Sequence, residues 1–181
     1  MQALKPLLNF RGRPWIIHQL DQFRRNGGKQ AVVVLGHQAN LIRAHLEEVF
    51  SWDQFNLTVA DNQQFELGQF SSLQVGLTQI NSDAAFITPI DVPIIQSSLF
   101  NLLEKHPAQV VLPANRNGKG HPILVRKKVL KKILESDPGF RLDHLIQKLP
   151  KEYVGIAKTN DPQINLNLNR PQKYAEYCAA L

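Results

Sequence analysis

Apolar residues follow two spacings along this chain: short continuous runs, and a helical periodicity of three and four residues. Residues 30–36 are a continuous, β-branched run, typical of a parallel strand buried on both faces. We predict strands or short extended segments at residues 30–36, 55–60, 84–90, 109–113, 123–126, 153–157 and 163–168. We predict helices at residues 14–26, 39–49, 71–79, 97–105, 128–136, 141–148 and 172–179, the last opened by Pro171.

This alternation of strands and helices predicts a single α/β domain over residues 1–181, with a mostly parallel sheet. Ligands of such sheets bind beyond the carboxyl ends of the strands. Asp91 and the Gly36-His37 pair both follow predicted strands. We therefore expect them to lie at that edge.

The composition fits a globular protein, with 181 residues of which 43% are hydrophobic and 20% charged. No apolar run approaches the length of a membrane span, and Lys5, Pro6 and Arg11 interrupt the start of the chain. We therefore expect a cytoplasmic protein without a membrane partner. The single cysteine, Cys178, excludes an internal disulfide and a cysteine-rich zinc site.

The net charge of +6 favours anionic partners, which include nucleic acid and phosphorylated small molecules. The densest basic group has helical spacing and is interpreted as a solvated helix face. Its members are Arg126, Lys127, Lys128, Lys131 and Lys132. The sequence carries no zinc-finger or RNP-type motif, so no nucleic-acid partner is expected.

Asp91 follows a predicted buried strand and precedes Pro93. A carboxylate in this position is well placed for Mg²⁺, which takes oxygen ligands, or it can cap the following turn. Asn62, Gly68 and Ser72 precede or begin the helix predicted at residues 71–79. A glycine there lets backbone amides approach an anion, although the serines of this segment can equally be helix caps.

His121 lies between a glycine and a proline, with no evident partner for acid–base catalysis, so it is expected to contact a substrate or shape its loop. Arg141 suits bidentate binding of a phosphate, or pairs with Asp137 or Asp143.

Asparagines alternate with leucines near the end of the chain, at positions 165, 167 and 169. In an extended segment they would share one face. Their amide oxygens are candidates for a second metal ligand, or the residues form the turn before the last helix.

Taken in order, these segments resemble the MobA-like branch of the nucleotidyltransferase superfamily, which acts in molybdenum cofactor biosynthesis. The matching segments are Lys5-Pro6-Leu7-Leu8 with Gly12-Arg13-Pro14, residues 62–77, Asp91-Val92-Pro93, Gly120-His121-Pro122, Gly139-Phe140-Arg141 and Asn167-Leu168-Asn169-Arg170-Pro171. Each segment alone is a weak signal, and their common order and spacing carry the resemblance.

The resemblance implies a Rossmann-like, three-layer α/β/α domain that transfers CMP or GMP from a nucleoside triphosphate to a phosphorylated acceptor. Pyrophosphate is released and Mg²⁺ is the cofactor. The Gly-His-Pro segment favours CTP over GTP and a molybdopterin-type acceptor.

The site residues that the resemblance implies fall into two groups. Asp91 is the Mg²⁺ ligand, Asn167 or Asn169 the second ligand, and Lys5 the cation that neutralises the triphosphate. The binding residues are Asn62, Gly68, Ser72, His121 and Arg141.

The front of the chain departs from the family, which opens with a strand and a glycine-rich loop that holds the triphosphate. Met1 stands where the last methionine of that loop is expected. We therefore expect a truncated domain whose sheet lacks a central strand beside residues 31–35 and 84–90. Three hypotheses follow: an enzyme whose given sequence starts too late, a non-catalytic relative that binds a nucleotide or a partner, and, more weakly, a basic protein associated with nucleic acid.

Overall fold

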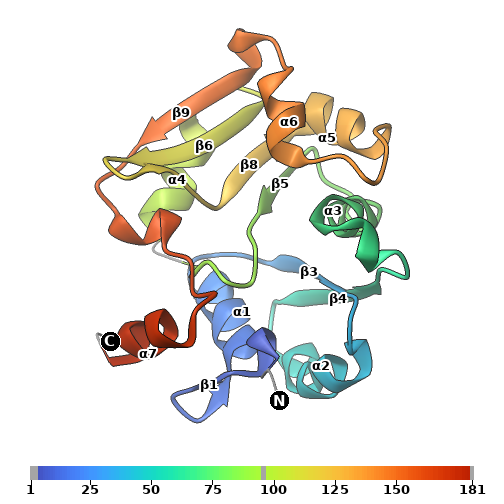
Figure 1. Cartoon of the computed structure of the whole chain (residues 1–181), viewed down its shortest axis with the longest axis vertical. Helices are drawn as coiled ribbons and strands as arrows, with labels where there is room; N and C mark the ends of the chain where they lie inside the picture. Colours follow the sequence, from blue (N-terminus) through green and yellow to red (C-terminus); the bar gives the residue numbers. More distant parts are fainter. Residues whose placement is uncertain (1–3, 95–96, 180–181) are drawn as a thin grey trace.

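The computed structural model describes residues 4–94 and 97–179 (Figure 1). Its strands are β1 (Asn9–Phe10), β2 (Arg13–Pro14), β3 (Gln30–Leu35), β4 (Asn56–Asp61), β5 (Ala84–Ile87), β6 (Val110–Asn115), β7 (Gly118–Lys119), β8 (Ile123–Arg126) and β9 (Val154–Lys158). Its α-helices are α1 (Trp15–Arg25), α2 (Ala39–His45), α3 (Gln69–Leu77), α4 (Ser97–Lys105), α5 (Lys127–Leu134), α6 (Leu142–Gln147) and α7 (Pro171–Ala179). Within the described ranges, no helix is long and apolar enough to cross a membrane.

The larger strands form two separate sheets, which confirms the predicted α/β class, although the second sheet is mixed rather than mostly parallel. β3 and β4 pair in parallel along their whole length. The second sheet has the order β5-β8-β6-β7, with β9 pairing β6 in parallel. In this sheet β8 is antiparallel to both β5 and β6, and β7 is antiparallel to β6. In Figure 1, β3 and β4 lie in the lower half of the molecule and the other sheet lies above them.

A break in strand pairing separates the two halves. Among the described residues, β3 pairs with β4 alone and β5 pairs with β8 alone. The apolar side chains of residues 31–34 and 84–87 are only half-buried, although such runs are typical of strands covered on all sides. Within the described residues, each of these two strands therefore has one edge without a strand partner.

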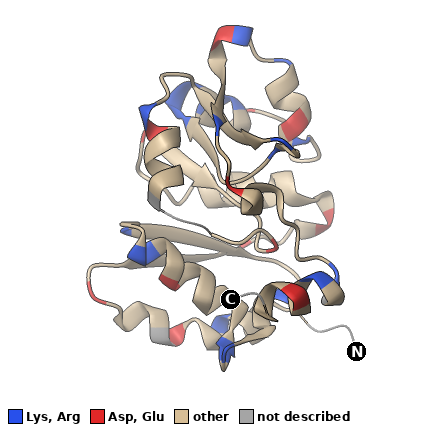
Figure 2. Cartoon of the chain, turned by 90° about the vertical axis from the view of Figure 1, so that its left-hand side faces the viewer, with Lys and Arg blue, Asp and Glu red and all other residues tan. Residues whose placement is uncertain are grey.

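Each half has its own helical cover. The apolar cluster around β3 and β4 buries Ile17 of α1 and Leu46, the residue after α2. It also buries Val49 of the 3₁₀ turn Glu47–Ser51. In the other half, α3, α5 and α6 pack on β8 and β6. α5 turns Val129 and Ile133 inward while its four lysines face solvent, which confirms the solvated-face interpretation for these lysines. Arg126 differs, because it ends β8, is half-buried and donates to the carbonyls of Ala108 and Glu104. Lys and Arg residues are spread over both halves of the molecule (Figure 2).

Two segments differ from the predicted elements. β5 ends at Ile87 rather than at residue 90, because Pro89 cannot donate to a strand ladder. The extended segment predicted at residues 163–168 is wrong. Pro162–Asn165 is a 3₁₀ helix, favoured by proline in its first turn and by Asp161, whose carboxylate accepts from the Gln163 amide at 2.8 Å.

Two buried side chains of α1 connect the halves across the break. The Trp15 indole donates to the carbonyl of Ile90 at 2.7 Å. The Gln19 amide donates to the carbonyl of Val92 at 2.7 Å, and its oxygen accepts from the Ile94 amide at 3.0 Å. Both side chains are almost inaccessible to solvent. The segment after β5 is therefore fixed onto a helix of the other half.

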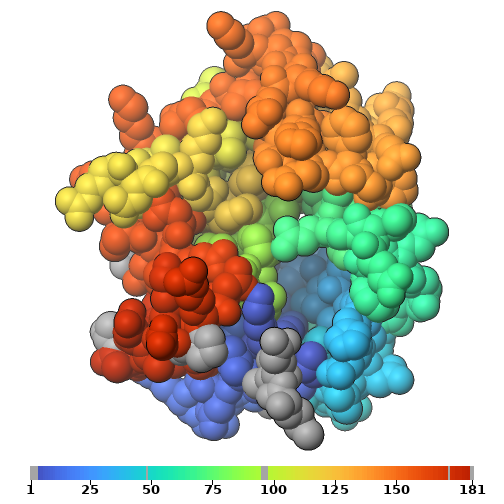
Figure 3. Space-filling view, viewed as in Figure 1, coloured from blue at the N-terminus to red at the C-terminus, as the bar shows by residue number. Residues whose placement is uncertain are grey.

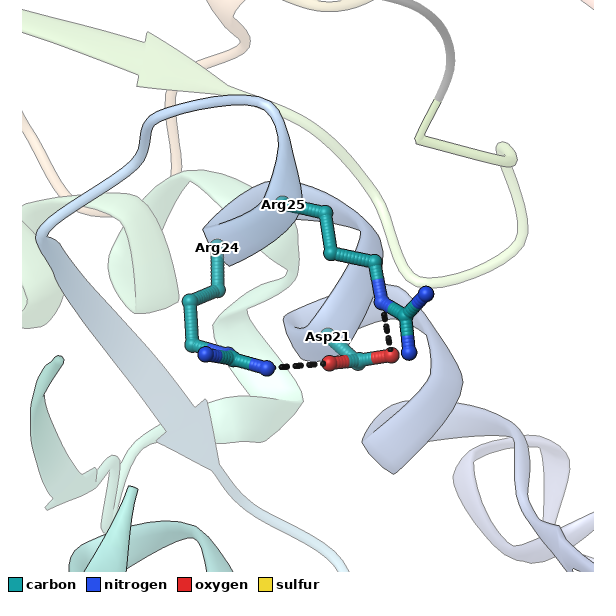
Figure 4. A network of polar contacts seen from close by, with 3 residues as sticks. All are labelled: Asp21, Arg24 and Arg25. Atoms are coloured by element: carbon teal, nitrogen blue, oxygen red, sulfur yellow. Dashed lines mark hydrogen bonds and ion pairs between the residues drawn. The ribbon is translucent and has the colours of Figure 1, made fainter. Parts of the chain in front are cut away.

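The end of α1 carries a small ion-pair network (Figure 4). The carboxylate of Asp21 accepts from Arg24 at 3.1 Å and from Arg25 at 2.7 Å. These arginines lie in the last turn of the helix, where cations complement the helix dipole. The Arg24 guanidinium also lies over the Trp52 ring, 5.3 Å from its centroid, and so ties α1 to the chain before β4.

We predict that Gln19→Ala destabilises the protein by about 2 to 4 kcal/mol, because it leaves a buried carbonyl and a buried amide of the segment after β5 without partners. Urea unfolding measures the change. Gln22→Ala on the same helix is the matched control and is expected to have a small effect. Equal destabilisation by the two substitutions would show that Gln19 does not fix the segment after β5 to α1.

Candidate functional site

A cavity of about 1320 Å³ lies between the two halves of the molecule. It is lined by β3, β5, α1 and α3 and by the segment that follows β5. Figure 3 shows the corresponding face of the molecule hollowed beside α3. The sequence-predicted site residues that line it are Lys5, Gly68, Ser72, Asp91, His121 and Arg141.

The polar end of the cavity joins three distant parts of the chain. Asp91 lies just beyond β5, and its backbone carbonyl accepts from the Leu168 amide at 2.8 Å. The next residue, Asn169, accepts a hydrogen bond from the ammonium of Lys5 through its side-chain oxygen. Lys5 and Asn169 are both exposed, and Asp91 is half-buried. A carboxylate, an ammonium and an amide are thus gathered where the carboxyl end of β5 meets the start of the chain.

Neither Asn167 nor Asn169 is among the residues that line the cavity, and Asn167 makes only a local contact. Its side-chain oxygen accepts from the backbone amide of Asn169 at 2.9 Å, and so closes a local turn. Leu168 points the other way and is buried with Phe10 and Trp15. Asn167 and Asn169 are therefore exposed on one side of the chain while Leu168 is buried on the other, as expected. Asn165 is not part of this alternation, because it belongs to the preceding 3₁₀ helix.

Asn62 is the centre of a buried network at the base of α3. Its amide donates to the hydroxyls of Ser71 and Ser72, each at 2.9 Å, and its oxygen accepts from the Gln64 amide at 2.9 Å. Ser71 in turn donates to the Gly68 carbonyl at 2.8 Å. The predicted residues Asn62, Gly68 and Ser72 are therefore brought together, with Asn62 inside the protein and the other two at the cavity.

Gly68 is the N-cap residue that precedes α3, and its φ of +103° is one that L side chains rarely adopt. It reverses the chain after the 3₁₀ turn Phe65–Leu67 and exposes the first turn of α3 to the cavity. A helix start of this kind offers unpaired backbone amides to an anion.

His121 reaches the cavity from the opposite sheet. Its Nδ1 lies 3.4 Å from the Ile87 carbonyl. Burial lowers the pKa of the imidazole, and the Ile87 carbonyl and the Asp91 carboxylate oppose this shift. The preceding residue must be glycine, because a Cβ at Gly120 would lie 2.1 Å from the Ile164 carbonyl oxygen.

Arg141 is exposed and pairs with Asp143, through Nε at 3.0 Å and through one terminal nitrogen at 2.9 Å. This pairing is one of the two alternatives to phosphate binding. Hydrogen bonds from the guanidinium lower the pKa of Asp143 to about 2. Arg141 nevertheless lines the cavity. A phosphate bound there would compete with the exposed carboxylate of Asp143 for the Arg141 guanidinium.

Sequence reasoning assigned no role to Lys119, which also lines the cavity. The available signal was its position between Gly118 and Gly120, in a segment already selected for His121. It also missed Trp15 and Gln19, which orient the Asp91 segment. No local pattern distinguishes these two from other polar or aromatic residues of a helix.

The donor chemistry at Asp91 suits a hard divalent cation. Within residues 4–94 and 97–179, no group of three or more His, Cys, Asp or Glu side chains gathers to hold a metal. Mg²⁺ does not require such a group, because it retains waters and usually takes one or two carboxylates together with substrate phosphates. Asp91 and the side-chain oxygen of Asn169 therefore fit this cation.

In this α/β fold, Asp91 and Lys5 line the same cavity as the start of α3. This arrangement is suited to binding phosphorylated nucleotides. The sequence profile of the MobA-like NTP transferase domain matches residues 1–153. This chain therefore belongs to the MobA-like family of nucleotidyltransferases, which confirms the resemblance described above.

Known proteins agree with this placement. The molybdenum cofactor cytidylyltransferase of Escherichia coli (strain K12) is 25% identical over 105 residues, which are 58% of this chain and 52% of that enzyme. The match thus spans about half the length of that relative (52%).

Three solved structures, of two proteins, have the same Rossmann-like fold. Rv0371c from Mycobacterium tuberculosis H37Rv has a TM-score of 0.78 and 17% identity, over 100% of this chain and 92% of that one. Its manganese complex has a TM-score of 0.74 and 18% identity, over 98% and 92%. A nucleotidyl transferase from Methanothermobacter (Mth528) has a TM-score of 0.79 and 19% identity, over 98% and 85%.

We predict that the protein loses stability as the pH falls below about 6.5 and that His121→Gln removes part of this loss. Burial lowers the pKa of His121 below its ordinary value of 6.5, so the unfolded chain binds more protons in this range. The stability that comes from neutral, buried His121 is fully present above pH 6.5 and declines as the pH falls toward its pKa in the folded protein. Urea unfolding between about pH 5 and 8 measures how the free energy of unfolding changes with pH. The slope of this dependence is the quantity compared between variants.

His18 has a pKa lowered by the same cause, so His18→Gln is expected to remove a further part of the slope. The same exchange at an exposed position, His37→Gln, is the control for the substitution itself. A slope that His121→Gln does not alter would contradict the prediction.

Proposed function

We propose that this chain binds a nucleoside triphosphate with Mg²⁺ at the polar end of the cavity and transfers the nucleoside monophosphate to a phosphorylated acceptor, releasing pyrophosphate. The observation that supports this proposal is that Lys5 and Asp91 both line the cavity, while Lys5 donates to Asn169 and Asp91 accepts from the neighbouring Leu168 amide. Membership of the MobA-like nucleotidyltransferase family supports transfer of this kind.

Asp91 would hold the metal, with Asn169 or Asn167 as the second oxygen donor. The bound cation supplies charge stabilisation to the phosphates, which is the main requirement of phosphoryl transfer. A manganese complex of a structural relative supports dependence on a divalent cation, and Mg²⁺ is our proposal for this chain.

The chain's own groups bind and orient the triphosphate. Lys5 exchanges the amide oxygen of Asn169 for a phosphate oxygen, which keeps its ammonium hydrogen-bonded while it neutralises charge. The amides at the start of α3, shaped by Gly68 and Ser72, provide neutral donors to a further oxygen. Arg141 can leave Asp143 for a dianionic group, because both residues are exposed.

CTP is the proposed nucleotide, with GTP as the alternative. The Gly-His-Pro segment and the similarity to a molybdenum cofactor cytidylyltransferase support CTP and a molybdopterin-type acceptor. His121, half-buried at the cavity wall, is the proposed contact to the bound substrates.

A second candidate function is a catalytically defective relative that binds a nucleotide or a partner without transfer. One observation favours it: the two candidate phosphate-binding cations, Lys5 and Arg141, already have internal partners in Asn169 and Asp143. In this case binding occurs without release of pyrophosphate.

We predict that Asp91→Asn weakens metal-dependent nucleotide binding at least about tenfold, because it removes the proposed carboxylate ligand while keeping the size of the side chain. Isothermal titration calorimetry with CTP or GTP, each with Mg²⁺ or EDTA, measures it. Asp83→Asn, whose carboxylate is exposed and pairs with Lys127, is the matched control.

The same samples separate the two candidate functions. Pyrophosphate release with CTP and an acceptor supports the transferase, whereas binding without release supports the defective relative. Unchanged Mg²⁺-dependent binding in Asp91→Asn would remove Asp91 from the site, whichever function is correct.

A further inference from the structure

The second sheet ends in an open strand edge at β9. This strand pairs with β6, and within the described residues it has no partner on its other side. In Figure 1, β9 forms the outer border of the upper half of the molecule. An open edge presents unpaired backbone groups with which another strand can pair.

The direction of these backbone groups follows from one hydrogen bond. The amide of Thr159 donates to the carbonyl of Ala114 at 2.9 Å, so it points toward β6. Successive amides of a strand point to opposite sides, and the parallel register with β6 is unbroken from Val154 to Lys158. The backbone groups of Val154, Ile156 and Lys158 therefore point away from β6, toward the open edge.

The side chains along this edge are complementary to a second copy of themselves. Val154 is half-buried and Ile156 is 38% exposed, and the two share one face of the strand. Glu152, in the 3₁₀ turn Lys151–Tyr153 directly before β9, and Lys158, at the end of β9, flank them. Both charged side chains are exposed, and neither forms an ion pair within the described part of the chain.

One antiparallel register satisfies all four positions. With Gly155 of the two copies at the centre, Val154 of each copy lies opposite Ile156 of the other. The same register brings Glu152 of each copy to Lys158 of the other. Apolar pairs and opposite charges in facing positions both stabilise paired strands. A register centred on Ile156 instead sets Lys158 against Val154 and leaves the charges without partners.

We propose that the β9 edge is a self-association surface through which two copies of this chain pair antiparallel about a two-fold axis at Gly155. Such a contact is isologous, and it joins the second sheets of the two copies into one. The outward groups of Val154 and Ile156 exchange about four backbone hydrogen bonds across it. The symmetry of the two charge pairs is the reason to assign a second copy rather than a different protein.

The size of this edge determines the strength of the dimer. β9 has five residues, and the contact is therefore smaller than the roughly 1,200 Å² of a standard stable interface. The dimer is accordingly weak and depends on protein concentration. The inference does not rest on the proposed nucleotidyl transfer, because no residue of β9 lines the cavity.

Sedimentation velocity of the full chain, at concentrations up to about 0.5 mM, measures the association. Glu152→Lys and Lys158→Glu each place like charges face to face twice in the dimer, and each is expected to weaken association at least about tenfold. The control Lys132→Glu makes the same change of charge on the exposed face of α5 and is expected to leave association unchanged.

Two further samples test the register itself. The double variant Glu152→Lys/Lys158→Glu keeps the net charge and exchanges the two partners, so it is expected to associate as the original chain does. An equimolar mixture of the two single variants is expected to form a mixed dimer, because every facing pair then has opposite charges. Failure of both samples to restore association would overturn the proposed pairing.

Hydrogen exchange at single residues locates the contact. The amides of Val154 and Ile156 are expected to exchange more slowly as the protein concentration rises. Those of Gly155 and Ala157 point toward β6 and serve as the internal reference. A chain that stays monomeric at every concentration contradicts the proposal. A dimer that Glu152→Lys does not weaken, or that leaves the two outward amides unprotected, contradicts it equally.

Discussion

The connection between the two halves of this protein depends on a few hydrogen bonds from one helix. Strand pairing normally continues through the middle of an α/β sheet, and here it stops between β3 and β5. Trp15 and Gln19 of α1 bond the carbonyls of Ile90 and Val92 from the other half, inside the protein. A typical hydrogen bond contributes only about 1 kcal/mol net, but a buried group that loses its partner costs more than that. The geometry of the centre is therefore sensitive to these two side chains.

The position of Asp91 follows from this connection. It lies between the two residues whose carbonyls accept from α1, and its own backbone carbonyl accepts from the Leu168 amide. The carboxylate is thus carried by a short segment fixed at both ends rather than by a long free loop. Such support is what a metal ligand requires, because the orientation of the ligand determines which oxygen faces the cation.

Sequence patterns predicted the elements of this fold well and their tertiary connections poorly. The run at residues 30–36 and the periodicity of α1 depend on local composition, and both appear within a residue or two of the expected bounds. The role of Gln19 depends on Val92, more than seventy positions away, and periodicity does not report such contacts. The segment at 163–168 was mistaken because alternation of asparagine and leucine suggested a strand, while Pro162 and Asp161 set a 3₁₀ turn. For the site, the motif order selected the residues that gather at the cavity, but not the Lys5–Asn169 contact that joins the two ends of the chain.

The polar groups of the candidate site divide by how readily they can change partners. Asn62 is buried, its amide donates to two serines of α3 and its oxygen accepts from the Gln64 amide, so its bonds maintain the shape of the loop. Lys5 and Arg141 are exposed, and exposed pairs contribute little to stability because water competes for both members. Exchange of Asn169 or Asp143 for a phosphate oxygen therefore loses little, and the new bond is made to a more highly charged acceptor. Asn62 thus belongs to the framework of the site, whereas Lys5 and Arg141 are the groups free to bind a ligand.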